Sequence, residues 1–442
     1  MLGVFRSTAR FKVVKELGVG GMGAVYEVID RELDRPLALK WLQRLDPQAL
    51  LRFKSEFRVA CGIDHRNLVS LGELIVDNGR WFFTMELISG VDFLSFVRSP
   101  RSSYDEDRLR SVLGQLAAGL MALHAADQVH RDIKPSNVLV TESGRLTLLD
   151  FGVAKALHVR SNLSSGAVVG TSEYMAPEQA MGQTVGAPAD WYSVGVLLFQ
   201  ALTGEVPFQG DHVQISLSKY RNDPPRPRDR LATVPADLDE LCFRLMQREP
   251  GQRPGGNDIL HAIGRAPSRG SALADTAHEH EQPHFLGRHD ELVALERAFT
   301  DSRHRPIIAR VSGPAGIGKS ALITEFRTRL RMRSGNALIL SSRCSTREKV
   351  PFKAVDPAID ALTHWLADRR RDELSTLIPD DVGALAQVFP VLRRLRPIAR
   401  AVRPDGEGDN WPDLYRRAGV ALAEMLRRIA AQRPIALLID DM

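Results

Sequence analysis

The stretch HRDIKPSN, residues 130–137, is followed by LLDFG, residues 148–152, so that two carboxylates and a carboxamide lie close together in the chain. Asp132 offers a base that can accept the proton of an attacking hydroxyl group. Asn137 and Asp150 carry oxygen ligands of the kind that magnesium prefers beside nucleotide phosphates. The pattern therefore indicates phosphoryl transfer, a reaction in which the protein mainly positions the reactants and neutralises charge.

These residues resemble the signature H-R-D-x-x-x-x-N plus D-F-G of bacterial serine/threonine protein kinases of the eukaryotic type, and Lys134 resembles that class rather than tyrosine kinases. The resemblance implies a two-lobed α+β fold, with a small lobe over about residues 1–88 and a large lobe over residues 89–263. It also implies ATP and Mg²⁺ as cofactors and serine or threonine hydroxyls of proteins as acceptors. Asp132 and Lys134 would be catalytic, and Asn137 and Asp150 would bind the metal and the nucleotide.

A glycine-rich segment, GVGGMGAV, follows a strand predicted over residues 11–17. A lone G-x-G-x-x-G match is a weak signal, but residues 24–30 alternate in polarity, which predicts a hairpin rather than a Rossmann turn. In a kinase such a loop brings its backbone amides to the phosphates of ATP. The resemblance assigns to ATP binding the residues Gly18, Val19, Gly20, Gly21, Met22, Gly23 and Val25.

Lys40 lies in the apolar segment PLALKWL, where a lysine would usually extend toward water. The resemblance instead implies a catalytic lysine that binds the α- and β-phosphates and pairs with a glutamate on the next helix. Glu56 lies in the predicted helix LLRFKSEFRVACGI. The other candidate partners of Lys40, Glu32 and Glu73, lie outside this helix. We therefore expect Lys40 to pair with Glu56.

The segment WFFTMELISG reads as a buried strand that leads into a connection between the lobes. By resemblance, Met85 lies behind the adenine pocket, although core packing alone would also explain it. Residues from Glu86 to Ile88 would bond the adenine edge through their backbone.

The stretch from Asp150 to Glu178 resembles an activation segment that ends in A-P-E. Candidate phosphorylation sites are Ser161, Ser164, Ser165 and Thr171. Arg131 offers a cation for a phosphate there, while Thr171 more closely resembles the threonine that contacts the catalytic aspartate and lysine.

Two further residues of the large lobe have expected structural roles. Asp190 resembles the aspartate that anchors the catalytic loop from below, and its alternative role is a helix N-cap. Arg253 resembles the buried partner of Glu178.

A second region begins after residues 264–283, which are rich in small residues, proline and charge and read as a linker. The apolar segment PIIARV, residues 306–311, is predicted to be a strand, and the G-x-x-x-x-G-K-S motif of residues 313–320 follows it. At the far end, PIALLIDD reads as an apolar strand that ends at Asp440 and Asp441.

This region, residues 284–442, resembles STAND and AAA-type ATPases in its F-x-G-R, Walker A and Walker B motifs. The resemblance implies an α/β P-loop NTPase domain with a parallel sheet, and oligomerisation through it. The implied nucleotide ligands are Gly313, Gly318, Lys319 and Ser320, with Ser320 and Asp440 as magnesium ligands. Because the chain stops directly after Walker B, we expect an incomplete sheet and a longer full-length protein.

Composition narrows the class of protein. The 442 residues suffice for two to three domains, and the formal net charge of +5 comes from mixed charges, so no specific nucleic-acid partner is predicted. The three cysteines are scattered, which suits a reducing compartment. Neither a signal peptide nor a membrane span is evident, and we expect a cytoplasmic protein.

The leading hypothesis is an ATP-dependent serine/threonine kinase fused to a regulatory nucleotide-binding module, which acts on protein substrates and phosphorylates itself in trans. The first alternative is a pseudokinase scaffold that binds nucleotide, and the second is a STAND switch whose output lies in missing C-terminal regions. The kinase motif residues are all present, which argues against a pseudokinase.

Overall fold

The computed structural model describes residues 5–20, 23–42, 46–77, 79–98, 104–150, 172–264, 287–314, 316–344, 347–402 and 411–441. The chain forms two compact units. The first comprises residues 1–43, 52–72 and 83–275, and the second comprises residues 44–51, 73–82 and 276–442. Among the described residues, no helix is long and apolar enough to cross a membrane.

A sheet with the strand order β1-β2-β3-β5-β4 forms the N-terminal part of the chain. The strands are β1, Phe11–Gly20; β2, Gly23–Asp30; β3, Arg35–Leu42; β4, Leu71–Asp77; and β5, Arg80–Met85. β1 and β2 pair as the antiparallel hairpin that the glycine-rich segment predicts. Residues of β2 alternate between buried and half-buried, as expected for a strand with one face on the core. The helix α1, Pro47–Ala60, follows β3 and carries Glu56.

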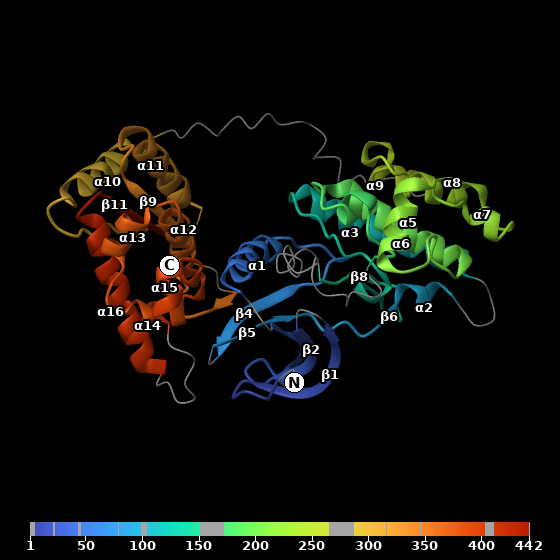
Figure 1. The fold of residues 1–442 in the computed structure, drawn as a ribbon, viewed down its shortest axis with the longest axis horizontal. Helices are drawn as coiled ribbons and strands as arrows, with labels where there is room; N and C mark the ends of the chain where they lie inside the picture. The colour runs from blue at the N-terminus through green and yellow to red at the C-terminus, as the bar shows by residue number, and fades with distance from the viewer. Residues whose placement is uncertain are drawn as a thin grey trace. The chain divides into compact units, whose positions relative to one another are not determined.

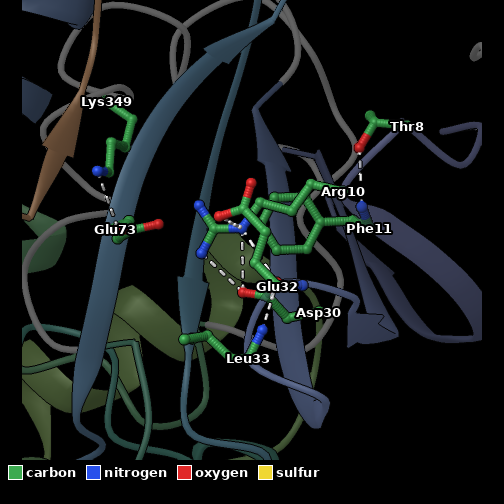
Figure 2. Close-up of polar contacts among 8 residues, drawn as sticks. All are labelled: Thr8, Arg10, Phe11, Asp30, Glu32, Leu33, Glu73 and Lys349. Carbon is green, nitrogen blue, oxygen red and sulfur yellow. Dashed lines mark hydrogen bonds and ion pairs between the residues drawn. The ribbon is translucent and has the colours of Figure 1, made fainter.

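At the end of β2, a buried carboxylate is paired with an arginine. The carboxylate of Asp30 is fully buried and accepts hydrogen bonds from Nε of Arg10 at 3.0 Å and from Nη2 at 2.7 Å (Figure 2). Burial by itself would raise the pKa of Asp30, but the hydrogen bonds from Arg10 and from the amides of residues 32 and 33 outweigh it and lower the pKa.

Helices dominate the rest of the first unit. They are α2, Phe93–Val97; α3, Glu106–Ala125; α4, Pro177–Ala180; α5, Ala187–Thr203; α6, His212–Arg221; α7, Pro227–Arg230; α8, Ala236–Leu245; and α9, Gly256–Ala262. A small sheet joins β6, Val91–Asp92, to β7, Val138–Val140, and β7 to β8, Leu146–Leu148. Short 3-10 turns cover Pro135–Asn137 and Pro250–Gln252.

The helix α5 forms the core of this helical part. It is buried around nearly its whole circumference, as expected for a segment that is apolar on every face. In Figure 1, α3, α5, α8 and α9 lie grouped together, in agreement with the contacts among them. Gly204 ends α5 in the left-handed conformation, at φ 91°.

The second unit contains a parallel pair of strands, β9, Leu338–Arg343, and β11, Ile435–Asp440. The helices α10, His289–Asp301, and α11, Lys319–Arg333, bury apolar side chains against this pair. The shared core contains Leu292, Leu322, Phe326, Leu330 and Ala436. The remaining helices are α12, Asp356–Ala367; α13, Arg371–Leu377; α14, Val382–Val388; α15, Arg396–Ala401; and α16, Trp411–Ala430, with a 3-10 turn over Pro390–Arg394.

A two-residue strand, β10, Glu348–Lys349, pairs in parallel with residues 74–75 of β4 inside this second unit. Nζ of Lys349 lies 3.9 Å from Oε1 of Glu73, as Figure 2 shows.

One predicted strand is wrong. Residues 306–311, which precede the glycine-rich P-loop, belong to no strand, and Ile308 is 97% exposed. An apolar pattern makes a strand only where a neighbouring chain completes the ladder of hydrogen bonds, and no described strand pairs with this segment. The end of the motif instead opens a helix, α11, which begins at Lys319.

Candidate active site

The catalytic loop is anchored by a single buried carboxylate. Asp190, in the first turn of α5, accepts hydrogen bonds from the backbone amides of His130 at 2.8 Å and Arg131 at 2.7 Å. Nε2 of His124 lies 2.8 Å from the same carboxylate. The N-cap of α5 is Gly186, so Asp190 is not the cap. The anchoring role predicted for Asp190 is confirmed.

His130 links this anchor to the strand end that precedes Asp150. Burial lowers the pKa of His130, despite the nearby carboxylate of Asp190, which favours the neutral imidazole. Its Nε2 donates to the carbonyl of Leu149 at 2.7 Å, and its Nδ1 accepts the amide of Asp132 at 3.2 Å. One tautomer satisfies both bonds, and the ring ties the backbone of the two motifs together.

The proposed base and its neighbours form a compact cluster. Nδ2 of Asn137 donates to Oδ2 of Asp132 at 2.9 Å and to the backbone carbonyl of Asp132 at 2.8 Å. Nζ of Lys134 lies 2.9 Å from the same Oδ2. The 3-10 turn Pro135–Asn137 folds the buried side chain of Asn137 back onto the loop. The structure thus brings Asp132, Lys134 and Asn137 together, as their spacing in the sequence suggests.

Lys40 lies on β3 with a buried side chain, and its Nζ is 2.6 Å from Oδ2 of Asp150. The predicted ion pair between Lys40 and Glu56, both of them described residues, is not formed. One carboxylate oxygen of Glu56 is buried without a hydrogen bond. Burial raises the pKa of Glu56 to about 7, although Arg131 and Arg52 act in the opposite direction. The structure therefore pairs the lysine with the aspartate of the D-F-G motif instead.

Two residues at this site have unusual backbone conformations. Arg131 and Asp150 are in the left-handed region, at φ 65° and 54°. Such conformations cost about 1–3 kcal/mol each in non-glycine residues and concentrate at functional sites. Here the amide bond from Arg131 to Asp190 and the ion pair of Asp150 with Lys40 hold them in place.

The described members of the predicted nucleotide-binding set lie at the end of β1 and the start of β2. Gly18 and Val19 are exposed, Gly23 has φ 147°, and Val25 lies in β2. Gly20 is the last residue of β1, and the predicted residues Gly21 and Met22 lie outside the described residues.

The predicted adenine-binding segment follows β5. Met85 is buried in the core, while Glu86 and Ile88 are half-buried. The amide of Glu86 donates to the carbonyl of Ser70 at 2.9 Å, and its carboxylate pairs with Arg145 at 2.6 Å. These bonds join Glu86 to the residues that directly precede β4 and β8.

The activation segment is described only at its C-terminal end. Residues 151–171, with the candidate phosphorylation sites Ser161, Ser164, Ser165 and Thr171, lie outside the described residues. At the end of the segment, Glu178 and Arg253 form the predicted buried pair, at 2.7 Å between Nη1 and Oε1 and 2.8 Å between Nη2 and Oε2.

Residues beyond the predicted ones lie beside the proposed base. A small hollow there, with no room for a water molecule, is lined by the catalytic-loop residues 131–134 and by Tyr174, Met175 and Ser193. Sequence reasoning did not single out these three residues. Their only signal was position, because two of them directly precede the A-P-E motif.

In the second unit, the P-loop lysine folds back onto its own loop. Nζ of Lys319 donates to the carbonyls of Gly313 and Pro314, each at 2.9 Å. Gly318 precedes α11 at φ 92°, in the left-handed region that favours glycine. Arg288, of the F-x-G-R motif, donates to the carbonyl of Ile317 in the same loop.

The predicted metal ligands of this unit are not joined. Asp440 ends β11, and its Oδ1 accepts the amide of Asp441 at 3.1 Å. Asp441 in turn pairs with Nε of Arg343 at 2.7 Å. Within the described residues, no hydrogen bond connects Asp440 to Ser320, which is exposed at the start of α11.

Comparison with known proteins agrees with the motifs of the N-terminal region. Residues 11–263, more than half of the chain, match the family model described as a protein kinase domain. The chain belongs to the protein kinase family. Residues 284–442 of this kinase match a second model, described as an AAA ATPase domain.

Two curated relatives of the kinase come from a bacterium. It is 36% identical over 249 residues to the serine/threonine-protein kinase PknL of Mycobacterium tuberculosis, a match that covers 55% of this chain and 62% of the relative. It is 34% identical over 283 residues to PknA of the same species, covering 60% of this chain and 64% of the relative. The chain thus spans less than two thirds of the length of these relatives.

A solved structure shares the fold. The twitchin kinase region from C. elegans superposes with a TM-score of 0.51 at 25% sequence identity, over 60% of this chain and 48% of that one. The protein kinase fold expected for the N-terminal region is therefore confirmed.

Proposed function

We propose that this chain is a serine/threonine protein kinase that transfers the γ-phosphoryl group of ATP to hydroxyl groups of proteins. The observation that carries the proposal is the cluster at Asp132, where Asn137 and Lys134 each lie within 2.9 Å of Oδ2. The hydrogen bond from Asn137 orients the carboxylate so that it can accept the proton of an acceptor hydroxyl. Lys134, beside the same oxygen, places a positive charge where the transferred phosphoryl group develops negative charge.

The donor set also fits a magnesium ion. Asn137 uses its amide nitrogen to bind Asp132, which leaves the amide oxygen as a ligand for a hard cation. Asp150 supplies a carboxylate, which Lys40 contacts from the other side. When bound, magnesium would neutralise the charge of the β- and γ-phosphates. Lys40 would exchange its contact with Asp150 for one with the nucleotide phosphates, and Glu56 is the partner available on α1.

The experiment that tests this function incubates the full chain with magnesium, radiolabelled ATP and an acceptor, followed by analysis of the labelled amino acids. The acceptors are casein and the chain's own Lys40→Met form, which reports phosphorylation in trans. We expect label on serine or threonine, and we expect Lys40→Met to abolish it, because the lysine binds the phosphates. The matched control is Lys12→Met, an exposed lysine in β1 of the same sheet, which should retain activity.

Two results would contradict the proposal: no magnesium-dependent transfer by the parent chain, or undiminished transfer by Lys40→Met. Either would favour the alternative of a nucleotide-binding scaffold.

We further propose domain boundaries that follow the two family matches: a kinase domain over residues 1–263, a linker over 264–283 and a P-loop NTPase domain of STAND type over 284–442. The three cysteines are few and scattered along the sequence, which suits the proposed cytoplasmic location. The NTPase domain would regulate the kinase through its nucleotide state, and it is the candidate surface for self-association.

Nucleotide binding by the second domain should depend on Lys319. Its ammonium now bonds two loop carbonyls and can move to a phosphate that the loop amides surround. We expect calorimetric titration of the full chain with ADP to detect two sites, and Lys319→Ala to weaken one of them about tenfold to hundredfold. Arg331→Ala, an exposed change on the same helix, is the control. Two sites of unchanged affinity in Lys319→Ala would remove the P-loop assignment.

A further inference from the structure

An arginine outside the kinase motifs contacts the segment that is expected to bind adenine. Nη2 of Arg145 lies 2.6 Å from Oε1 of Glu86, and both side chains are 34% exposed. Arg145 lies in the turn between β7 and β8, whereas Glu86 directly follows β5. The pair therefore joins two segments that are 59 residues apart in the sequence.

The connecting segment, residues 86–90, is held at both ends and has free backbone groups between them. The amide of Glu86 donates to the carbonyl of Ser70 at 2.9 Å. At the other end, a Cβ on Gly90 would lie 2.5 Å from the carbonyl oxygen of Val140, so only glycine allows this close approach. Within the described part of the chain, the backbone groups of residues 87 and 88 make no hydrogen bond. These amides and carbonyls are the groups available to bond the edge of an adenine ring.

The arginine belongs to the hairpin that carries the expected metal ligands. β7 directly follows Asn137, and β8 ends two residues before Asp150. The amide of Leu149 donates to the carbonyl of Asn137 at 2.8 Å, which closes this end of the hairpin. Arg145 lies at the opposite end, in the turn that joins the two antiparallel strands. One hairpin thus has the expected metal ligands at one end and the arginine at the other.

The turn is fixed by side chains from two other segments. The amide of Leu146 donates to Oε1 of Gln115, on α3, at 3.0 Å. The carbonyl of Leu146 accepts a bond from Nδ2 of Asn67 at 2.7 Å, and Nε2 of Gln115 donates to the carbonyl of Gly144 at 2.8 Å. The residues on both sides of Arg145 are therefore bonded to the surrounding fold, and its guanidinium extends from a fixed position.

We infer that Arg145 is a positioning residue for the nucleotide: by pairing with Glu86, it fixes the connecting segment relative to the hairpin of β7 and β8. The backbone groups that would bond adenine and the residues that would bind the metal at the phosphates are then held at a set separation. The inference rests on the proposed kinase function and deepens it. It assigns to Arg145 a role in binding ATP and in the choice of adenine over other bases, and none in binding the acceptor polypeptide.

Loss of the pair should leave the fold intact. Ion pairs that water reaches contribute little to stability. The bonds from Gln115 and Asn67 hold the turn without help from the guanidinium. A change of Arg145 therefore releases the connecting segment while the hairpin keeps its place.

The test measures kcat and KM of the full chain for ATP, for GTP and for casein, with magnesium present. In Arg145→Met we expect the KM for ATP to rise about three- to tenfold, because the adenine-binding backbone is no longer held in place, and the KM for casein to stay unchanged. The preference for ATP over GTP, measured as the ratio of their kcat/KM values, should fall as well. The two bases present different donors and acceptors, and only a backbone held in place distinguishes them well. Arg145→Lys should restore most of the affinity, since the contact uses one guanidinium nitrogen.

Two further variants separate the pair from general effects. Glu86→Gln removes the opposite charge. A double variant, Arg145→Met with Glu86→Gln, should have a KM for ATP no higher than that of the worse single variant, as expected for two residues that act as one pair. The matched control is Arg230→Met, which breaks an exposed pair with Glu205 at 3.4 Å and should retain all three KM values.

An unchanged KM for ATP in both Arg145→Met and Glu86→Gln would overturn the inference. So would equal rises in the KM values for ATP and casein, or additive effects of the two changes, since the residues would then not act as a pair on the nucleotide. A loss of folding of both single variants in circular dichroism would also overturn it, because the role would be structural; if only one is lost, the other decides. An inactive parent chain would instead refute the proposed kinase function, and the inference with it.

Discussion

Replacing Asp132 by Asn is expected to lower kcat for phosphoryl transfer about 10²–10⁴-fold, the usual contribution of a general base. Asparagine has the shape of aspartate, and its side-chain oxygen can still accept the bonds from Asn137 and Lys134. It cannot take up the proton of the acceptor hydroxyl. The variant therefore removes the base while it preserves the geometry around it, and steady-state kinetics with casein and saturating ATP measure the loss.

The binding of nucleotide separates this effect from misfolding. Asp132 is not among the residues expected to contact the phosphates, so the affinity of Asp132→Asn for ATP should be that of the parent chain. The matched control is Asp127→Asn, an exposed residue close by whose left-handed backbone, at φ 54°, asparagine also tolerates. If Asp132→Asn retained the parent kcat, the assignment of Asp132 as the base would be wrong.

The second large effect concerns stability. Replacing Glu178 by Ala should lower the free energy for opening the helical part by about 3–5 kcal/mol, because it leaves a buried guanidinium without its counter-charge. The side chain of Arg253 is 0% exposed and also bonds the carbonyls of Gln247, Arg248 and Pro188, so it cannot turn toward water. Hydrogen exchange at the amides of α5, which Arg253 contacts, measures the loss locally in a chain that has two units.

An exposed ion pair provides the control. Arg110 and Asp237 pair at 2.7 Å, with the side chain of Asp237 46% exposed. Asp237→Ala should cost only about 0–1 kcal/mol, as surface pairs usually do. A double variant that replaces both partners, Glu178→Leu with Arg253→Met, should lower the free energy for opening less than Glu178→Ala does. The reason is that no buried charge is then left without a partner. A loss of about 1 kcal/mol or less in Glu178→Ala would contradict this account of the pair.

Much of the catalytic loop could be predicted from the sequence because its parts are neighbours in the chain. Asp132, Lys134 and Asn137 lie within six positions of one another, and a single 3-10 turn suffices to bring their side chains together. The glycine-rich hairpin is equally local, since β1 ends at Gly20 and β2 begins at Gly23. Over such short separations, residue type and spacing leave few alternatives for the backbone.

Contacts between segments that are far apart in the sequence could not be predicted in this way. The sequence contained both candidates for the partner of Lys40, but the choice of Asp150 over Glu56 depends on how β3, α1 and the end of β8 pack. A strand over residues 306–311 was expected from its apolar residues, but a strand also needs a neighbour, and the described residues provide none.

By itself, the sequence determined the protein kinase family and the order of the two regions, and it predicted the base, the lysine and the metal ligands. Only the tertiary structure decided which charged side chains from distant segments contact one another. Lys219, a buried lysine of α6, shows why: it lies 44 to 47 residues from the three backbone carbonyls that its Nζ bonds, and its helix has no motif that marks it. An ammonium that is removed from water must be hydrogen-bonded by acceptors within the fold. Whether a lysine is buried depends on how all the surrounding elements pack, and the sequence of its own helix does not show this.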